Sequence, residues 1–152
     1  MKNALKNIHL EEEFDSKSYL LQISKIKTRL NAKIKQLDEL HNFKSISGIN
    51  YDKPFSKNKN ISDQISNVVV KLTDLEIEIK SDIYDYTVLK DKIIDEIYNI
   101  SDISSMNLLM MRYVDMMSLE KIAVELNFSY HYVRHLHSVA LKKFKTSHTM
   151  SH

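Results

Sequence analysis

The sequence predicts an all-α protein, and three observations support that expectation. The 152 residues include one Gly and one Pro, whereas a β-sandwich or a doubly wound sheet of this length needs many turns marked by these residues. Long apolar series recur at three- and four-residue steps, the spacing of one helix face. The last third of the chain contains short apolar segments, each preceded by Ser or Asp, which cap helices. With 43% apolar residues, the chain can form one domain, or a small domain with an appendage.

Two long helices are expected on either side of a hinge. Gly48 and Pro54 both lie in the segment 45–60, where the apolar periodicity stops. Before the hinge, the repeating apolar residues are Leu20, Ile23, Leu30, Ile34 and Leu37. After it, they are Ile65, Val68, Leu72, Leu75, Ile79, Ile83, Tyr86, Ile93, Ile97 and Ile100, following a candidate cap at Ser62. This 3.5-residue period is that of a coiled-coil seam, so we expect a long antiparallel helical hairpin over residues 15–100.

Each long helix also has a second apolar stripe at seven-residue spacing. Its members are Tyr19, Ile26 and Leu40 before the hinge, and Val70, Ile77, Tyr84 and Tyr98 after it. A single antiparallel hairpin buries one stripe per helix, so the second stripe needs another surface to cover it. We therefore expect a homodimer held together by the hairpin.

The region 101–145 is predicted to fold as three short helices that include a helix-turn-helix. A cluster of capping residues, 101–104, separates it from the second long helix, and Ser118 is placed to cap the next helix. Asn127 can adopt the left-handed conformation that ends a helix, and Ser129 can cap the last one. The segments 1–14 and 146–152 are expected to be tails.

Ten side chains of this region are expected to point inward. They are Leu108, Met111, Ile122, Ala123, Leu126, Val133, Leu136, Ala140, Leu141 and Phe144. Phe128 is also expected to be structural, and replacing a buried leucine such as Leu141 by alanine should cost about 2 to 5 kcal/mol.

The charge distribution directs any contact with nucleic acid to the C-terminal segment. The whole chain has a net charge of only +2, but residues 61–117 hold five Lys/Arg and eleven Asp/Glu, a net charge of −6. Residues 118–152 hold five Lys/Arg and two Asp/Glu, a net charge of +3, together with five of the seven histidines. A polyanion is therefore attracted to the last 35 residues and repelled by the middle of the chain.

A known pattern runs through residues 108–144, LLMMRYVDMMSLEKIAVELNFSYHYVRHLHSVALKKF. An Arg-Tyr pair is followed by the spacing of "s-l-e-e-I-A-e-x-l" and of "S-x-x-x-V-x-x-x-x-x-x-A-L-x-x-L". The matching residues are Arg112, Tyr113, Leu119, Glu120, Ile122, Ala123, Leu126, Ser129, Val133, Ala140 and Leu141. This pattern resembles region four of bacterial sigma factors. The arrangement of the whole chain is similar to that of prophage proteins described as sigma-like, which are related in style to phage autolysin regulators and late-gene activators.

This resemblance implies a DNA-binding transcriptional regulator, in particular of phage late genes. The chain has no room for the sigma region that melts promoter DNA, so it is not expected to initiate transcription alone. In a helix-turn-helix, the second helix enters the major groove. Its outward residues are Tyr130, His131, Arg134, His135 and Ser138. Arg134 is the best candidate for reading a base, because a guanidinium can donate two hydrogen bonds to guanine. Lys142, Lys143 and Lys145 are expected at phosphates of double-stranded DNA.

Other chemistry is not expected. The chain has no Cys, and it lacks a Gly-rich phosphate loop or a nucleophile with a base at a known spacing, so neither an enzyme nor a cofactor is predicted. His131 and His135 have the spacing of a metal pair, but their helix offers no carboxylate and a zinc site needs a third ligand. No apolar run is long enough for a signal peptide or a membrane span. A cytoplasmic protein without membrane contact is expected.

Two alternatives remain open at this point. A phage small terminase subunit also joins a helix-turn-helix to an oligomerising coiled coil, but it forms rings and serves DNA packaging. The other alternative is an interaction protein that binds RNA polymerase and does not read DNA. A methionine cluster is either core packing or the surface for such a partner; it comprises Met106, Met110, Met111, Met116 and Met117.

Overall fold

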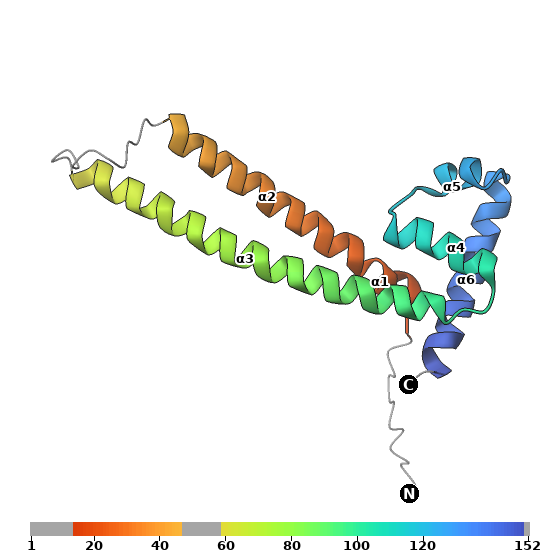
Figure 1. Cartoon of the computed structure of the whole chain (residues 1–152). Helices are drawn as coiled ribbons and strands as arrows, with labels where there is room; N and C mark the ends of the chain where they lie inside the picture. Colours follow the sequence, from red (N-terminus) through yellow and green to blue (C-terminus); the bar gives the residue numbers. More distant parts are fainter. Residues whose placement is uncertain (1–13, 47–58, 151–152) are drawn as a thin grey trace, which may run out of the picture. The chain divides into compact units, whose positions relative to one another are not determined.

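The computed structural model describes residues 14–46 and 59–150, and these contain helices and no strand, which confirms the all-α expectation (Figure 1). The helices in chain order are α1 (Ser16–Leu20), α2 (Gln22–Ile46), α3 (Lys59–Tyr98), α4 (Ile103–Leu109), the π-helix η1 (Met110–Val114), α5 (Leu119–Glu125) and α6 (Tyr130–Met150). They form two compact units. One consists of 22–94, and the other joins the N-terminal residues up to Leu21 to 95–152. We call them the long-helix unit and the C-terminal unit.

In the long-helix unit, α2 and α3 pack side by side in opposite directions. Lys33 Nζ lies 2.9 Å from Glu78 Oε2, and His41 Nε2, further along α2, lies 3.9 Å from Glu76 Oε1, earlier in α3. The buried core between the two helices contains Leu30, Leu75 and Ile79, with Leu37 and Leu40 packed against it. Burial of these apolar side chains is the main force that holds two helices together.

The predicted seam was wrong by one position on each helix. Ile34 and Ile83 are 39% and 46% exposed, whereas Asp82 is buried and Lys33 is half-buried. The reason is the spacing, because alternating steps of four and three from Leu75 lead through Ile79 to residue 82 and not to 83.

The buried carboxylate at this seam position is neutralised by two cations. Asp82 Oδ2 lies 2.8 Å from Lys33 Nζ, and its Oδ1 lies 2.9 Å from Arg29 Nη2. The contact with Lys33, followed by the hydrogen bond from Arg29, lowers the pKa of the Asp82 carboxyl from its usual value. A buried charge without such partners would be costly, so these ion pairs allow a polar residue in the seam.

The second apolar stripe is divided between exposed and packed residues. On α3, Val70, Tyr84 and Ile77 are exposed in the single chain, Ile77 by 61%. Tyr19, expected on the same dimer surface, instead packs inside the C-terminal unit, where its hydroxyl donates to Glu96 Oε1 at 3.0 Å. Tyr19 therefore does not contribute to the predicted dimer surface.

The first long helix of the hairpin predicted from residue 15 is interrupted at Leu21, between α1 and α2. Asp15 caps α1 by accepting hydrogen bonds from the backbone N–H groups of Lys17 and Ser18. α1 then packs against α6, so that it belongs to the C-terminal unit rather than to the long helices. Apolar spacing alone did not reveal this break, because the periodicity continues through it.

Each predicted tail includes residues that belong to the folded C-terminal unit. Phe14 stacks on His148 with ring centroids 4.2 Å apart, and α6 continues to Met150 rather than ending at Lys145. No Gly or Pro follows Pro54, so nothing in the sequence stops the last helix. The rest of the predicted N-terminal tail, 1–13, and most of the predicted hinge, 47–58, lie outside the described residues.

Candidate nucleic-acid interface

Side-chain caps define where the helices of the C-terminal unit begin. Ser118 Oγ accepts from Lys121 N at 3.2 Å at the start of α5, and Ser129 Oγ accepts from Tyr132 N at 3.2 Å at the start of α6. Both caps confirm the prediction. Asp102, within the predicted capping cluster, begins α4 by accepting from Ser105 N at 3.1 Å. Each cap satisfies a backbone donor that the helix itself leaves unpaired.

The turn between α5 and α6 is a Schellman motif. Phe128 N donates to Ala123 O at 2.9 Å, and Asn127 N donates to Val124 O at 3.1 Å, which are the two hydrogen bonds of that motif. Asn127 has a φ of 53°, the left-handed conformation predicted for it. Asparagine tolerates this conformation better than most residues, so the turn keeps a defined geometry without glycine.

The interior of the C-terminal unit contains most of the side chains predicted to point inward. Those that are buried are Leu108, Ile122, Ala123, Val133, Leu136, Ala140 and Phe144. Met111, Leu126 and Leu141 are only partly buried. The expectation for Phe128 was wrong, because its side chain is 46% exposed and lies edge-on to the ring of Tyr132. It follows the Schellman turn, where the chain passes over the surface.

The Arg-Tyr pair of the sequence pattern has structural roles. Tyr113 is buried in η1, and its hydroxyl lies 2.9 Å from His137 Nε2 on α6. Arg112 donates from Nη1 to the carbonyl of Met117 at 2.8 Å. This hydrogen bond holds the segment that connects η1 to α5. Met116 lies in this segment and has an unfavourable φ of 59°. The pair therefore fixes both α6 and the start of the helix-turn-helix.

The burial of His137 makes the stability of this unit sensitive to pH. Burial, together with the charges of Arg112 and Lys17, lowers the pKa of His137. The unfolded chain therefore binds a proton more readily than the folded one, and stability should fall as the pH decreases below about 6.5, the ordinary pKa of histidine. Urea unfolding at pH 7.5 and 5.0 measures this loss.

The variant His137→Phe is the control for this prediction. It cannot be protonated, so the difference between its stabilities at the two pH values should be smaller than that of the wild type. An equal difference in both proteins would show that other histidines cause the pH dependence.

All seven residues predicted to contact DNA are exposed on α6. Along the helix, His131, Arg134, Ser138 and Lys142 follow at three- and four-residue steps, which places them on one face. Arg134 lies over the ring of Tyr130, with its Cζ 6.0 Å from the ring centroid. His135 lies beside this face, one residue after Arg134. We call these residues, together with Lys142, the outer face of α6.

Lys143 has a different position from the rest. Its Nζ lies 2.7 Å from Asp102 Oδ2, the carboxylate that caps α4. Hydrogen bonds from Lys143 and then from Ser105 lower the pKa of Asp102 to about 2, so the carboxylate stays charged at neutral pH. Lys143 thus connects α6 to α4, a role that its place in a basic cluster did not indicate.

Helix α6 itself has Arg and Lys residues and neither Asp nor Glu, while the Glu120 carboxylate of α5 lies close enough to Tyr130 of the outer face to interact with it. No protein-family model, curated protein or solved structure matches the chain.

Among the described residues, no group of three or more His, Cys, Asp or Glu side chains is arranged to hold a metal ion. No helix in the described ranges is long and apolar enough to cross a membrane.

Proposed function

We propose that this protein binds double-stranded DNA through α6 and regulates transcription, in particular that of phage late genes. The observation that supports this proposal is the combination of α5, a Schellman turn and α6, whose outer face is polar and basic. The arrangement resembles sigma region four in its motif. Arg134 lies near the start of α6, where a recognition helix approaches base edges.

Because α6 is longer than the major groove is wide, its two halves have different roles in DNA binding. Its 21 residues extend over about 31 Å, while the major groove is about 12 Å wide. The N-terminal half, with His131 and Arg134, can therefore contact bases. The C-terminal half, with Lys142, extends over the sugar-phosphate backbone, where lysines add affinity without sequence preference.

Selection from random DNA duplexes, followed by titration of the selected duplex at two salt concentrations, tests the proposed function. We expect enrichment of a common sequence and binding well below the ~10⁻⁴ to 10⁻⁶ M typical of non-specific contacts at physiological salt. If no sequence is enriched and binding remains in that range, the proposal of DNA reading fails. The alternative of an RNA polymerase-binding protein that does not read DNA would then replace it.

We further propose that the exposed stripe on α3 forms a homodimer. Val70, Ile77 and Tyr84 recur at intervals of seven residues, which keeps them on one face of a helix that pairs with another. The two long helices also differ in charge. The described part of α2 with defined side chains, 22–42, holds five Lys/Arg and two Asp/Glu, while α3 holds five and nine. Contact between α3 of one copy and α2 of another is thus electrostatically favourable.

Light scattering at micromolar concentration should give the mass of two chains. Ile77→Asp should reduce it to the mass of one chain, because a charge in the apolar stripe opposes association. Ile103→Asp is a control, since Ile103 is also exposed, by 69%, but belongs to the C-terminal unit. A monomeric wild type would contradict the dimer, and a large ring would favour the small terminase subunit instead.

A further inference from the structure

The faces through which α2 and α3 pack on each other contain one charged residue each (Figure 1). On α2, the buried or half-buried residues at steps of four and three are Ile26, Leu30, Lys33, Leu37 and Leu40. On α3, they are Leu72, Leu75, Ile79, Asp82, Tyr86 and Leu89. This repeat keeps one face of a helix against its partner. Lys33 and Asp82 therefore interrupt two series that are otherwise uncharged.

The two charged residues meet each other across the seam. Lys33 Nζ lies 2.8 Å from Asp82 Oδ2 and 2.9 Å from Glu78 Oε2. Arg29 Nη2 donates to Asp82 Oδ1 at 2.9 Å. The side chain of Asp82 is 9% exposed, while that of Arg29 is 54% exposed at the edge of the seam. A buried carboxylate is costly without such cations, so the position of Asp82 restricts how α2 can lie against α3.

A displacement of one helix along the other would separate the carboxylate from both cations. A shift by seven residues keeps the apolar faces together and moves α2 by about 10 Å. The positions of the two cations opposite Asp82 are then taken by Ile26 and Gln22 in one direction, and by Leu40 and Gln36 in the other. Neither pair contains a cation, so each displaced alignment leaves a buried carboxylate without a counterion.

The length of the connection between the helices does not fix their alignment. Residues 47–58 separate α2 from α3, and a chain of that length can reach about 40 Å when extended. The displacement of about 10 Å is well within this reach. The apolar series also repeat every seven residues and match in each displaced alignment. The alignment therefore depends on the charged residues of the seam.

We propose that the ion pair of Lys33 and Asp82, assisted by Arg29, selects a single alignment of α2 on α3. In coiled coils, a polar residue at one seam position fixes the alignment at a cost in stability. A single alignment keeps the outer faces of α2 and α3 at fixed heights relative to each other, which any surface built from both helices requires. This role is independent of DNA binding.

Replacing both charges by leucine, Lys33→Leu together with Asp82→Leu, tests the proposal. This leucine variant should be at least as resistant to urea as the wild type, because packed apolar residues can replace a buried ion pair without loss of stability. It should nevertheless lose the single alignment. The chain has no cysteine, so pairs of introduced cysteines and a short thiol crosslinker report which positions are neighbours.

Three pairs of cysteines distinguish the alignments. His41 Nε2 lies 3.9 Å from Glu76 Oε1, so His41→Cys with Glu76→Cys reports the observed alignment. His41→Cys with Val69→Cys, or with Ile83→Cys, reports a shift by seven residues in each direction. With the natural charges, the first crosslink within one chain should exceed the other two on the order of a hundredfold. In the leucine variant, the three yields should differ by less than about tenfold.

Lys35→Leu with Asp91→Leu is the matched control, because both residues are exposed and lie outside the two series. This control should retain the wild-type pattern of crosslinks. The proposal is refuted if the leucine variant also retains that pattern. It is equally refuted if circular dichroism shows that the leucine variant has lost its long helices, because the charges would then be needed for stability rather than for alignment.

Discussion

Replacing Phe144 by alanine should lower the free energy of unfolding of the C-terminal unit by about 3 to 5 kcal/mol, the usual cost of removing a buried phenylalanine. Its side chain is 0% exposed. The ring lies 6.1 Å from that of Tyr19 and 6.4 Å from that of Phe14, measured between centroids. The substitution therefore leaves a cavity where α1 packs on α6. Urea unfolding followed by circular dichroism measures the change.

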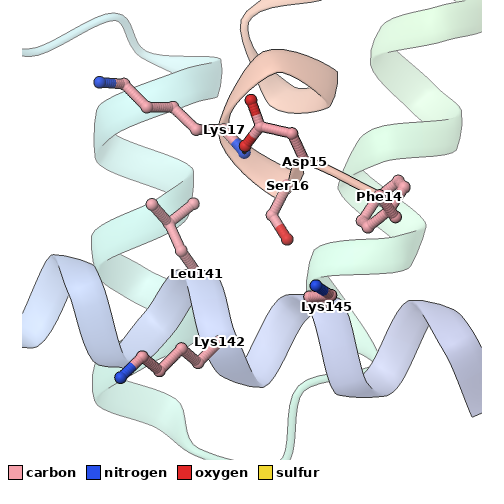
Figure 2. A pocket seen from close by; sticks show the side chains of 7 residues that line it. All are labelled: Phe14, Asp15, Ser16, Lys17, Leu141, Lys142 and Lys145. Carbon is pink, nitrogen blue, oxygen red and sulfur yellow. The ribbon is translucent and has the colours of Figure 1, made fainter. Parts of the chain in front are cut away.

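Two further variants make this prediction specific. Phe128→Ala removes the same side chain at an exposed position and should change stability by less than about 1 kcal/mol. Leu141→Ala should fall below the 2 to 5 kcal/mol typical of buried leucines, because Leu141 is only partly buried, beside a groove between α1 and α6 (Figure 2). A cost for Phe144→Ala no greater than that for Phe128→Ala would contradict the packing of α1 on α6.

Arg134→Ala should weaken binding to the selected DNA by about 1 to 3 kcal/mol and relax the preference at one base pair. Truncation removes a guanidinium that can donate two parallel hydrogen bonds to one guanine. Lys142→Ala should instead weaken binding to all duplexes alike and reduce the salt slope by about one. Titration of both variants on the selected duplex and on a scrambled duplex measures the contrast.

Lys143→Ala provides an internal comparison in the same assay. Because Lys143 is held by Asp102, its removal should reduce the salt slope less than the removal of Lys142 does. If Arg134→Ala weakens binding to the scrambled duplex as much as to the selected one, Arg134 contacts a phosphate and does not read a base.

Sequence spacing was reliable where a residue's environment depends on its own helix. The scarcity of Gly and Pro correctly predicted an all-α protein, and Ser118, Asn127 and Ser129 occupy the caps and the turn that were expected of them. Caps and turns use side chains and backbone groups a few residues apart, so local sequence is sufficient to predict them.

The same spacing failed where two positions on a helix were nearly equivalent. Ile83 continues the apolar series four residues after Ile79, but Asp82 occupies the seam. An isolated helix offers no means to choose between neighbouring positions. The choice was made by Lys33 and Arg29 of the other helix, which neutralise the carboxylate.

The sequence by itself determined that the chain is helical, where the caps Ser118 and Ser129 lie, and which residues of α6 are exposed, because these depend on neighbours within a few residues. Only the tertiary structure decided that α1 packs on α6, that Tyr113 meets His137, that Lys143 is bound to Asp102, and that Ser16 and Lys17 line a groove with Lys145. Those contacts join residues between 24 and 129 positions apart. They depend on which faces of separate helices meet, and helical periodicity within one segment contains no information about that.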